Sequence, residues 1–273
     1  MKKTELAWDG YYNYLIEAMH ESKFWKRAEL KPMSTPKTNY EAHVSTRASH
    51  MQEAADIVKR LAEGLGLNGE FAYAGMLGHD AGHPFSAHEG EEIFTYLGEL
   101  YNTQYFHHNA KGIEIILSED ICGNAISKIP NIEENPELRK KLEEDFYYIL
   151  DMVISHDGEA SAKDMAKKET QYDNIKEAVL DKMNKSNAQN DYKFVAQTSE
   201  GKLAKYADVI AYLASDMQDA FRLGIIEDFS DKYLELFGQM YSSKEIAEQK
   251  KELIEAFWED QEHGSFLNLF QFL

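Results

Sequence analysis

The stretch GHDAGHPFSAHEGE, residues 78–91, gathers titratable side chains at a point where the chain must turn. It holds three histidines, one aspartate and two glutamates among three glycines and a proline. Gly82 and Pro84 favour a break in the backbone directly after His79 and Asp80. Neighbouring side chains on a regular helix diverge by about 100°, but at a helix end both can face one ion. The stretch therefore predicts a helix that ends at a polar site.

The rest of the chain has the pattern of an all-α protein. It contains five prolines in 273 residues, and alternating apolar and polar runs are scarce. Helices are predicted over 4–22, 47–65, 69–79, 87–101, 108–118, 135–156, 163–186, 198–223, 230–240 and 243–258. We expect loops over 31–45 and 118–136. The polar stretch 160–191 is expected to be either a peripheral helical excursion or a partly mobile flap. No internal repeat or linker stands out, so one domain over 1–273 is expected.

Two of these helices place polar groups beside the predicted core. In 47–65, the residues Ala54, Ile57, Leu61 and Leu65 form an apolar stripe, and His50 falls on it. In 198–223, the expected core face consists of Tyr206, Ile210, Leu213, Met217 and Ala220. A second stripe close to that face consists of Asp208, Tyr212, Asp216 and Asp219. Carboxylates near a core are costly unless they are paired or bound to a cation, so Asp208 is a candidate ligand.

Seven of the ten histidines fall within residues 43–108: His43, His50, His79, His83, His88, His107 and His108. Imidazole and carboxylate together suit divalent ions such as Zn, Fe or Mn, and without a cysteine cluster a thiolate zinc site is excluded. His50, His79, Asp80 and Asp208 could hold one ion and leave positions for water and substrate. An incompletely filled set of ligands is typical of catalytic metal.

Composition excludes several classes of protein. The net charge of −19 argues against non-specific binding to nucleic acid. No run of about 18 apolar residues predicts a membrane span, and the interrupted N-terminus predicts no secretory signal. The single cysteine, Cys122, is expected to be a small core residue in a reducing, cytoplasmic protein.

The order His50 … His79-Asp80 … Asp208 resembles the signature of the HD-domain metal-dependent phosphohydrolases, and so implies an HD-domain helical bundle. Four segments narrow the resemblance to the dGTPase-like branch, the deoxynucleoside triphosphate triphosphohydrolases. They are TRASHMQEAADIVKRLAEGLGLN (46–68), GHDAGHPFSAHEGE, FHHNAKGIEIIL (106–117) and YADVIAYLASDMQDAFRLGII (206–226). The implied HD core covers about 43–226, with 227–273 as a C-terminal helical extension. SHDGE (155–159) is a looser match.

The resemblance implies a role for each matching residue. His50, His79, Asp80 and Asp208 would hold the metal. His88 and Glu91 match a catalytic histidine and acid, while His83 and His108 match active-site histidines near the phosphates. Arg47 matches an arginine that contacts phosphate, and Tyr212 and Asp216 match residues that bind the sugar. His108 or His88 would activate water or protonate the leaving oxygen.

The implied activity is hydrolysis of a dNTP to deoxynucleoside and inorganic triphosphate. The expected cofactor is Mn²⁺ or Mg²⁺, with Fe, Co, Ni and Zn as alternatives. Two alternative functions are also considered. One is an HD-type phosphohydrolase that acts on a nucleoside monophosphate, cyclic dinucleotide or alarmone, and the other is a non-catalytic nucleotide-binding module. A homo-oligomer is expected by analogy. The family's Arg-rich N-terminal stretch is not recognisable in residues 1–40, so no base preference is predicted.

Overall fold

The computed structural model describes residues 10–32, 45–157, 172, 174–188 and 194–222, and from 213 onward only the backbone. These residues contain no strand, which confirms the all-α prediction; Pro32 and Thr46 form one isolated antiparallel bridge. In chain order the helices are α1 (Tyr11–Glu21), α2 (Lys23–Leu30), α3 (Arg47–Gly64), α4 (Gly69–Leu77), α5 (Ala87–Tyr101), α6 (His108–Ser118), α7 (Ile121–Ser127), the short 3₁₀ helix η2 (Ile132–Glu134), α8 (Pro136–Ser155), α10 (Ile175–Ala188) and α11 (Ser199–Arg222).

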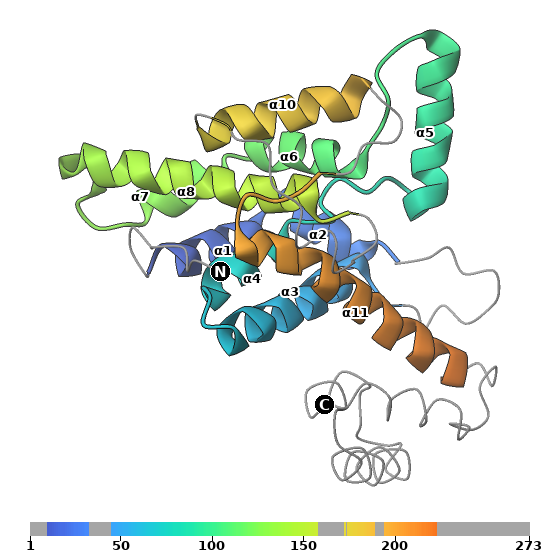
Figure 1. Ribbon diagram of the computed structural model, residues 1–273, viewed down its shortest axis with the longest axis horizontal. Helices are drawn as coiled ribbons and strands as arrows, with labels where there is room; N and C mark the ends of the chain where they lie inside the picture. Colours follow the sequence, from blue (N-terminus) through green and yellow to red (C-terminus); the bar gives the residue numbers. More distant parts are fainter. Residues whose placement is uncertain (1–9, 33–44, 158–171, 173, 189–193, 223–273) are drawn as a thin grey trace, which may run out of the picture. The chain divides into compact units, whose positions relative to one another are not determined.

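The chain divides within α11 into two compact units, Met1–Ile210 and Ala211–Leu273. The first unit is built on two groups of helices. Helices α3 and α4 form its most extensive helix pair, and α4 also packs on α8. Helices α6, α8 and α10 pack against one another (Figure 1). The prediction of one domain over 1–273 stays a prediction.

Side-chain caps fix where the helices of the core begin. The hydroxyl of Thr46 accepts a hydrogen bond from the backbone N–H of Ser49 and so opens α3. The side chain of Asn68 accepts from the N–H of Phe71 and opens α4 in the same way. Such caps satisfy backbone donors that the first turn leaves without a partner. They therefore set the starting points of the two helices that lead to the polar site.

Three predicted boundaries were wrong. The segment 118–136 is not a loop, because it contains α7 and η2, whose apolar residues, among them Ile121 and Ile126, are buried. A separate helix, α2, follows α1, because Ser22 is extended and caps a new helix. The helix over 69–79 ends at Leu77. Sequence patterns are least reliable at such boundaries.

The predicted core faces of two helices were also shifted. In α3 the inward side is formed by Met51, Ala54, Ala55 and Val58, whereas Leu65 is exposed. In α11 the buried positions include Leu203, Ala204, Ala207 and Ala211, and Tyr206 and Ile210 are half-buried. Small residues let helices approach closely, so the packed sides contain alanines beside Met51, Val58 and Leu203, which a pattern based on large apolar residues alone does not predict.

Several predictions fall outside the described residues. They are the helices over 230–240 and 243–258, the extension 227–273, His43, most of the loop over 31–45, the stretches 158–171 and 189–193 of the polar excursion, and the side chains of Leu213, Asp216, Met217, Asp219 and Ala220. Within the described part of the chain, no helix is long and apolar enough to cross a membrane.

Candidate metal centre

The polar stretch quoted above folds as a tight connection between α4 and α5. Gly78 caps α4, and residues 78–82 form turns before Pro84. A side chain at Gly82 would collide with the carbonyl oxygen of His108 and the backbone of Gly112 in α6. Glycine is therefore required for the connection to lie directly on the first turn of α6. This contact places His79 and Asp80 near the start of α6.

Four polar residues from three parts of the first unit converge beside this connection, and we call them the cage: His50, His79, Asp80 and Asp208. His50 comes from α3 and Asp208 from α11. The Nε2 atom of His50 lies 3.0 Å from Oδ1 of Asp208. The Nε2 atom of His79 lies 3.5 Å from that same oxygen and 3.5 Å from Oδ1 of Asp80. His50, His79 and Asp80 are almost fully buried.

The cage has the spacing and chemistry that a divalent cation requires. Metal–ligand bonds of about 2.1 Å place neighbouring ligand atoms roughly 3 to 3.5 Å apart. The ligand atoms of His50, His79 and Asp80 lie within 4.8 Å of one another, as do those of His79, His156 and Asp208. His79 donates from Nδ1 to the carbonyl oxygen of Met76 at 2.7 Å, which turns Nε2, the atom that would bind a cation in place of a proton, toward the carboxylates. Such a hydrogen bond behind the ring is typical of a metal-binding histidine.

Electrostatics in the cage also favour a cation. Burial lowers the pKa of His79, but the carboxylates of Asp80 and Asp208 outweigh it and raise this pKa to about 9. Burial acts to raise the pKa of Asp208, yet hydrogen bonds from His50 and His79 hold it well below its usual range. The carboxylates of buried Asp80 and half-buried Asp208 therefore stay ionised, and a positive charge among them is stabilised.

Arg47, predicted to contact phosphate, is buried and donates from Nη1 to Oδ2 of Asp80. This ion pair directs the other oxygen of Asp80 toward His79 and His83. A second cation lies nearby, because the ammonium group of Lys31 donates to the backbone carbonyl of His83 at 2.7 Å. Burial, then the neighbouring charges of Arg27 and Arg47, lower the pKa of Lys31. Sequence reasoning missed Lys31, since nothing in its local pattern sets it apart.

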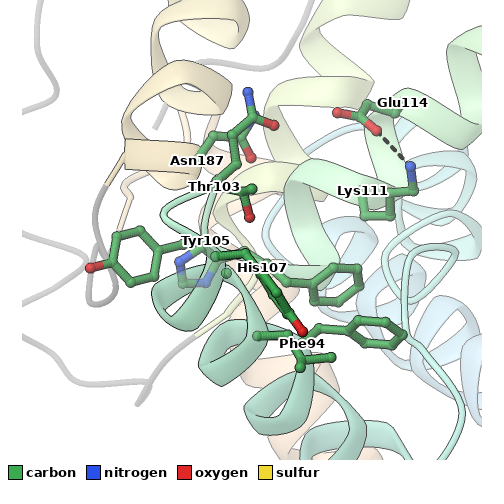
Figure 2. A pocket seen from close by; sticks show the side chains of 12 residues that line it. Phe94, Thr103, Tyr105, His107, Lys111, Glu114 and Asn187 are labelled. Carbon is green, nitrogen blue, oxygen red and sulfur yellow. Dashed lines mark hydrogen bonds and ion pairs between the residues drawn. The ribbon is translucent and has the colours of Figure 1, made fainter.

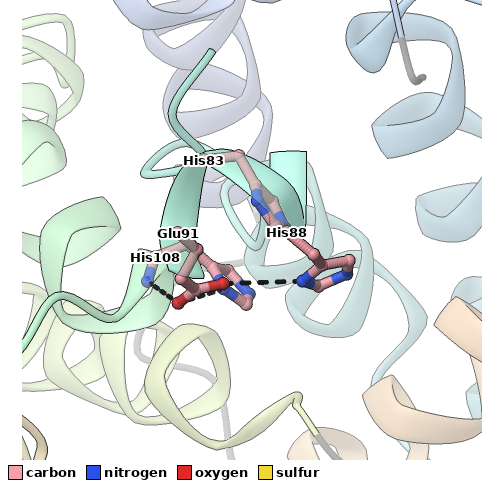
Figure 3. Close-up of side chains that lie close together, drawn as sticks. All are labelled: His83, His88, Glu91 and His108. Atoms are coloured by element: carbon pink, nitrogen blue, oxygen red, sulfur yellow. Dashed lines mark hydrogen bonds and ion pairs between the residues drawn. The ribbon is translucent and has the colours of Figure 1, made fainter. Parts of the chain in front are cut away.

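A second group, the histidine–Glu91 cluster, consists of His83, His88, Glu91 and His108 (Figure 3). Glu91 accepts hydrogen bonds from the backbone N–H of His108 at 2.8 Å and from its Nδ1 at 3.0 Å. Its nearest approach to Nδ1 of His88 is longer, 3.5 Å. Burial acts to raise the pKa of Glu91, but hydrogen bonds from His108 and His88 hold it far below its usual range. Glu91 is thus an ionised partner that chiefly orients His108.

The ring of His83 stacks on that of His108, with centroids 3.8 Å apart and planes only 11° from parallel. Burial, the charge of His108 and that of Arg47 lower the pKa of His83 to about 3, despite Asp80, so the ring is neutral. Stacked rings hold their lone pairs in separate planes and cannot both direct them at one ion. The cluster therefore suits proton transfer better than a second metal.

His156 joins the cage to the histidine–Glu91 cluster. Its Nε2 lies 3.9 Å from Oδ1 of Asp80 and 3.4 Å from Nε2 of His108. Its Nδ1 donates to the carbonyl of Val153 at 2.6 Å, which aims Nε2 at the site. Burial, His79 and His108 lower its pKa to about 4. The sequence signal was the short SHDGE segment, directly after a buried stretch of α8.

Three predicted site residues are less closely connected. The side chain of His88 is 64% exposed, at the edge of the cluster. Tyr212 is half-buried and belongs to the second unit, and the side chain of Asp216 lies outside the described residues. The roles assigned to all three stay predictions.

Comparison with known proteins identifies one family and a set of relatives that share one description. The family described as HD domain matches residues 47–213. A "Deoxyguanosinetriphosphate triphosphohydrolase-like protein" of Clostridium tetani (strain Massachusetts / E88) is 28% identical over 225 residues, 82% of this chain and 50% of the relative. A protein of the same description from Desulfatibacillum aliphaticivorans is 27% identical over 67% of this chain and 40% of the relative. Another, from Clostridium perfringens (strain SM101 / Type A), is 26% identical over 82% of this chain and 51% of the relative. The chain thus spans about half the length of the curated relatives it matches, or less.

Proposed function

The chain belongs to the HD-domain family, and from that premise we propose that it is a metal-dependent phosphohydrolase that cleaves dNTPs to deoxynucleoside and inorganic triphosphate. One observation carries the proposal. A cage able to hold a divalent metal and a Glu91–His108 pair lie in one buried site of the first unit. The three relatives described above as deoxyguanosinetriphosphate triphosphohydrolase-like proteins support the choice of a triphosphate substrate.

In this proposal the cage residues His50, His79, Asp80 and Asp208 hold Mn²⁺ or Mg²⁺. When bound, such a cation supplies Lewis-acid polarisation of a phosphate oxygen and lowers the pKa of water. Arg47 positions Asp80 through their buried ion pair, and this contact directs one carboxylate oxygen toward His79. The residues further along α11, Tyr212 and Asp216, are proposed to bind the sugar.

His108 is the proposed proton carrier. Its Nδ1 donates to Glu91, so Nε2 holds the lone pair and can accept a proton from the attacking water. Ionised Glu91 then stabilises the imidazolium that forms. The oxygen of water bonds to the α-phosphorus, the bond from phosphorus to the 5′-oxygen breaks, and His108 returns the proton to that oxygen. His83 stays neutral against the ring of His108 and fixes its orientation.

The test is to incubate the protein, loaded with Mn²⁺ or Mg²⁺, with each of the four dNTPs and to separate the products by chromatography. Inorganic triphosphate and deoxynucleoside in equal amounts are expected. Stepwise release of phosphate would contradict the proposed bond cleavage. If no dNTP is turned over, the same assay with nucleoside monophosphates, cyclic dinucleotides and alarmones tests the alternative substrates, and binding without any turnover would indicate a nucleotide-binding module. Protein treated with a chelator is the control.

A further inference from the structure

Helix α5 exposes apolar side chains that ordinary helices bury. We call Ile93, Phe94, Tyr96, Leu97, Leu100 and Tyr101 the α5 stripe, and every one of them is exposed. The buried residues of α5 are two glycines, Gly90 and Gly98. A contiguous apolar patch of this kind marks an interaction site in a folded protein.

The attachment of α5 to the body of the first unit is narrow. Among the described helices, α5 packs extensively against none, and it stands apart from α6, α8 and α10 (Figure 1). The hydroxyl of Thr95 donates to the carbonyl of Phe106 at 3.1 Å, and Glu91 accepts from His108. An isolated helix of 15 residues is marginally stable in water. Its position therefore depends on few contacts, one of which is the proposed catalytic pair.

The stripe has the spacing of a helix–helix seam. Ile93, Leu97 and Leu100 are separated by four and three residues, which aligns them along one side of the helix. If Leu97 and Leu100 occupy the a and d positions of a heptad, the positions that flank the seam hold Phe94, Tyr96 and Tyr101. The one charged residue at these flanking positions is Glu89, near the N-terminal end of the helix. The acids Glu92 and Glu99 fall on positions that turn away from the seam. A second α5 could lie against it without forcing those carboxylates together.

A groove of about 640 Å³ adjoins the stripe (Figure 2). Phe94, Leu97 and Tyr101 of α5 line it together with Tyr105 and Phe106 of the following segment. Its charged residues at α6, Lys111 and Glu114, pair with each other at 2.8 Å. Aromatic and aliphatic side chains form the α5 side of the groove, and its two opposite charges pair with each other, which suits apolar side chains of a partner better than a phosphate group.

We infer that α5 is the docking surface for a second copy of this chain, with the two α5 helices packed against each other about a two-fold axis. A symmetric dimer buries the same patch on both subunits, so the patch must complement itself, as an uncharged seam does. The exposed area of the stripe is roughly 700 Å² per chain. A stable interface buries about 800 Å² on each partner, so the two areas are similar. The interface would hold the helix that carries Glu91. That consequence for catalysis rests on the proposed function, but the interface does not.

The first test measures the mass of the full chain by light scattering over a range of concentration. We expect twice the chain mass for the natural protein, and the chain mass for Leu97→Glu and Leu100→Glu, because like charges would meet across the axis. Leu65→Glu, directly after the end of α3, is the matched control, since Leu65 is 57% exposed and Leu100 59%. A monomeric natural protein, or α5 variants that keep the mass of the control, would overturn the inference. Circular dichroism checks that each variant is folded.

The second test is a cross-link at the axis. Leu97 lies at the middle of the seam, so Leu97→Cys in a Cys122→Ser background should form a disulfide between chains on oxidation. Leu65→Cys in the same background should stay monomeric on a non-reducing gel. Equal cross-linking of the two would contradict the inference. Because mass and cross-linking do not depend on turnover, a dimer that hydrolyses no dNTP would refute the proposed function alone. An active monomer would refute the interface alone.

Discussion

The cage buries charged side chains, whereas α5 exposes apolar ones. A buried carboxylate and an exposed patch of leucine and tyrosine are both unfavourable for an isolated chain, and each is more informative than an ordinary core residue. In the cage, Asp80 and Asp208 are surrounded by imidazole and guanidinium groups. At α5, the described residues provide no comparable cover. The first region is suited to hold a cation, and the second is the surface proposed to meet a protein.

Removing a carboxylate from the cage is expected to have the largest effect. Asp208→Ala should abolish metal retention and reduce dNTP turnover below detection, because His50 and His79 would lose the oxygen that both face. The measurement is metal content after gel filtration, together with turnover. Asp56→Ala in α3 is the control, since Asp56 lies outside the cage and accepts a hydrogen bond from Gln52 at 3.4 Å. An Asp208→Ala variant with full metal content would contradict the ligand assignment.

Next in size is the loss of the acid beside His108. Glu91→Gln should lower kcat by about 10²- to 10⁴-fold, the usual contribution of a general acid–base group. The amide can still accept a hydrogen bond from His108 but cannot stabilise its charge. Metal content should not change, because Glu91 lies outside the cage. The exposed neighbour Glu92→Gln is the matched control, and equal kcat values for the two variants would exclude Glu91 from proton transfer.

The arrangement of the site was partly predictable from sequence. Spacing along a helix and a turn rich in glycine indicated that His50, His79, Asp80 and Asp208 belong together. The link from His108 to Glu91 could not be predicted, because it depends on how closely α6 approaches the turn at Gly82. The position of His156 between the cage and the histidine–Glu91 cluster could not be predicted for a similar reason, because it depends on where α8 ends.

Helix types and most helix positions also followed from periodicity, yet the packed faces of α3 and α11 did not. The pattern of large apolar residues predicted that Leu65 and Tyr206 face the core, but the buried faces consist of alanines together with Met51, Val58 and Leu203. The stripe on α5 illustrates the same limit. Its periodicity predicts an amphipathic helix, and only the structure shows that the apolar side is exposed.

A buried charge pair outside the site should affect stability without affecting chemistry. Lys182 of α10 donates to Asp151 of α8 at 2.5 Å and to the hydroxyl of Ser155 at 2.9 Å, and both charged residues are buried. Lys182→Met leaves Asp151 without this cation and should lower the free energy of unfolding by about 3–5 kcal/mol. Denaturant unfolding measures it. The kcat of the folded fraction should match that of the natural protein, and a change in kcat would place the pair in the active site.

The smallest expected effect concerns the reactivity of Cys122, the only cysteine in the sequence. Its thiol lies 3.6 Å from the hydroxyl of Tyr11. Burial is the main cause that raises its pKa to about 11, so at pH 8 the thiol is protonated. Because the thiolate is the reactive form, alkylation should be roughly 100-fold slower in the native protein than in denaturant. It should speed up as the pH rises toward 11, whereas a cysteine introduced at the exposed Leu65, outside the proposed interface, should react at the rate of a free thiol. A Cys122 that reacts equally fast folded and unfolded would contradict its burial beside Tyr11.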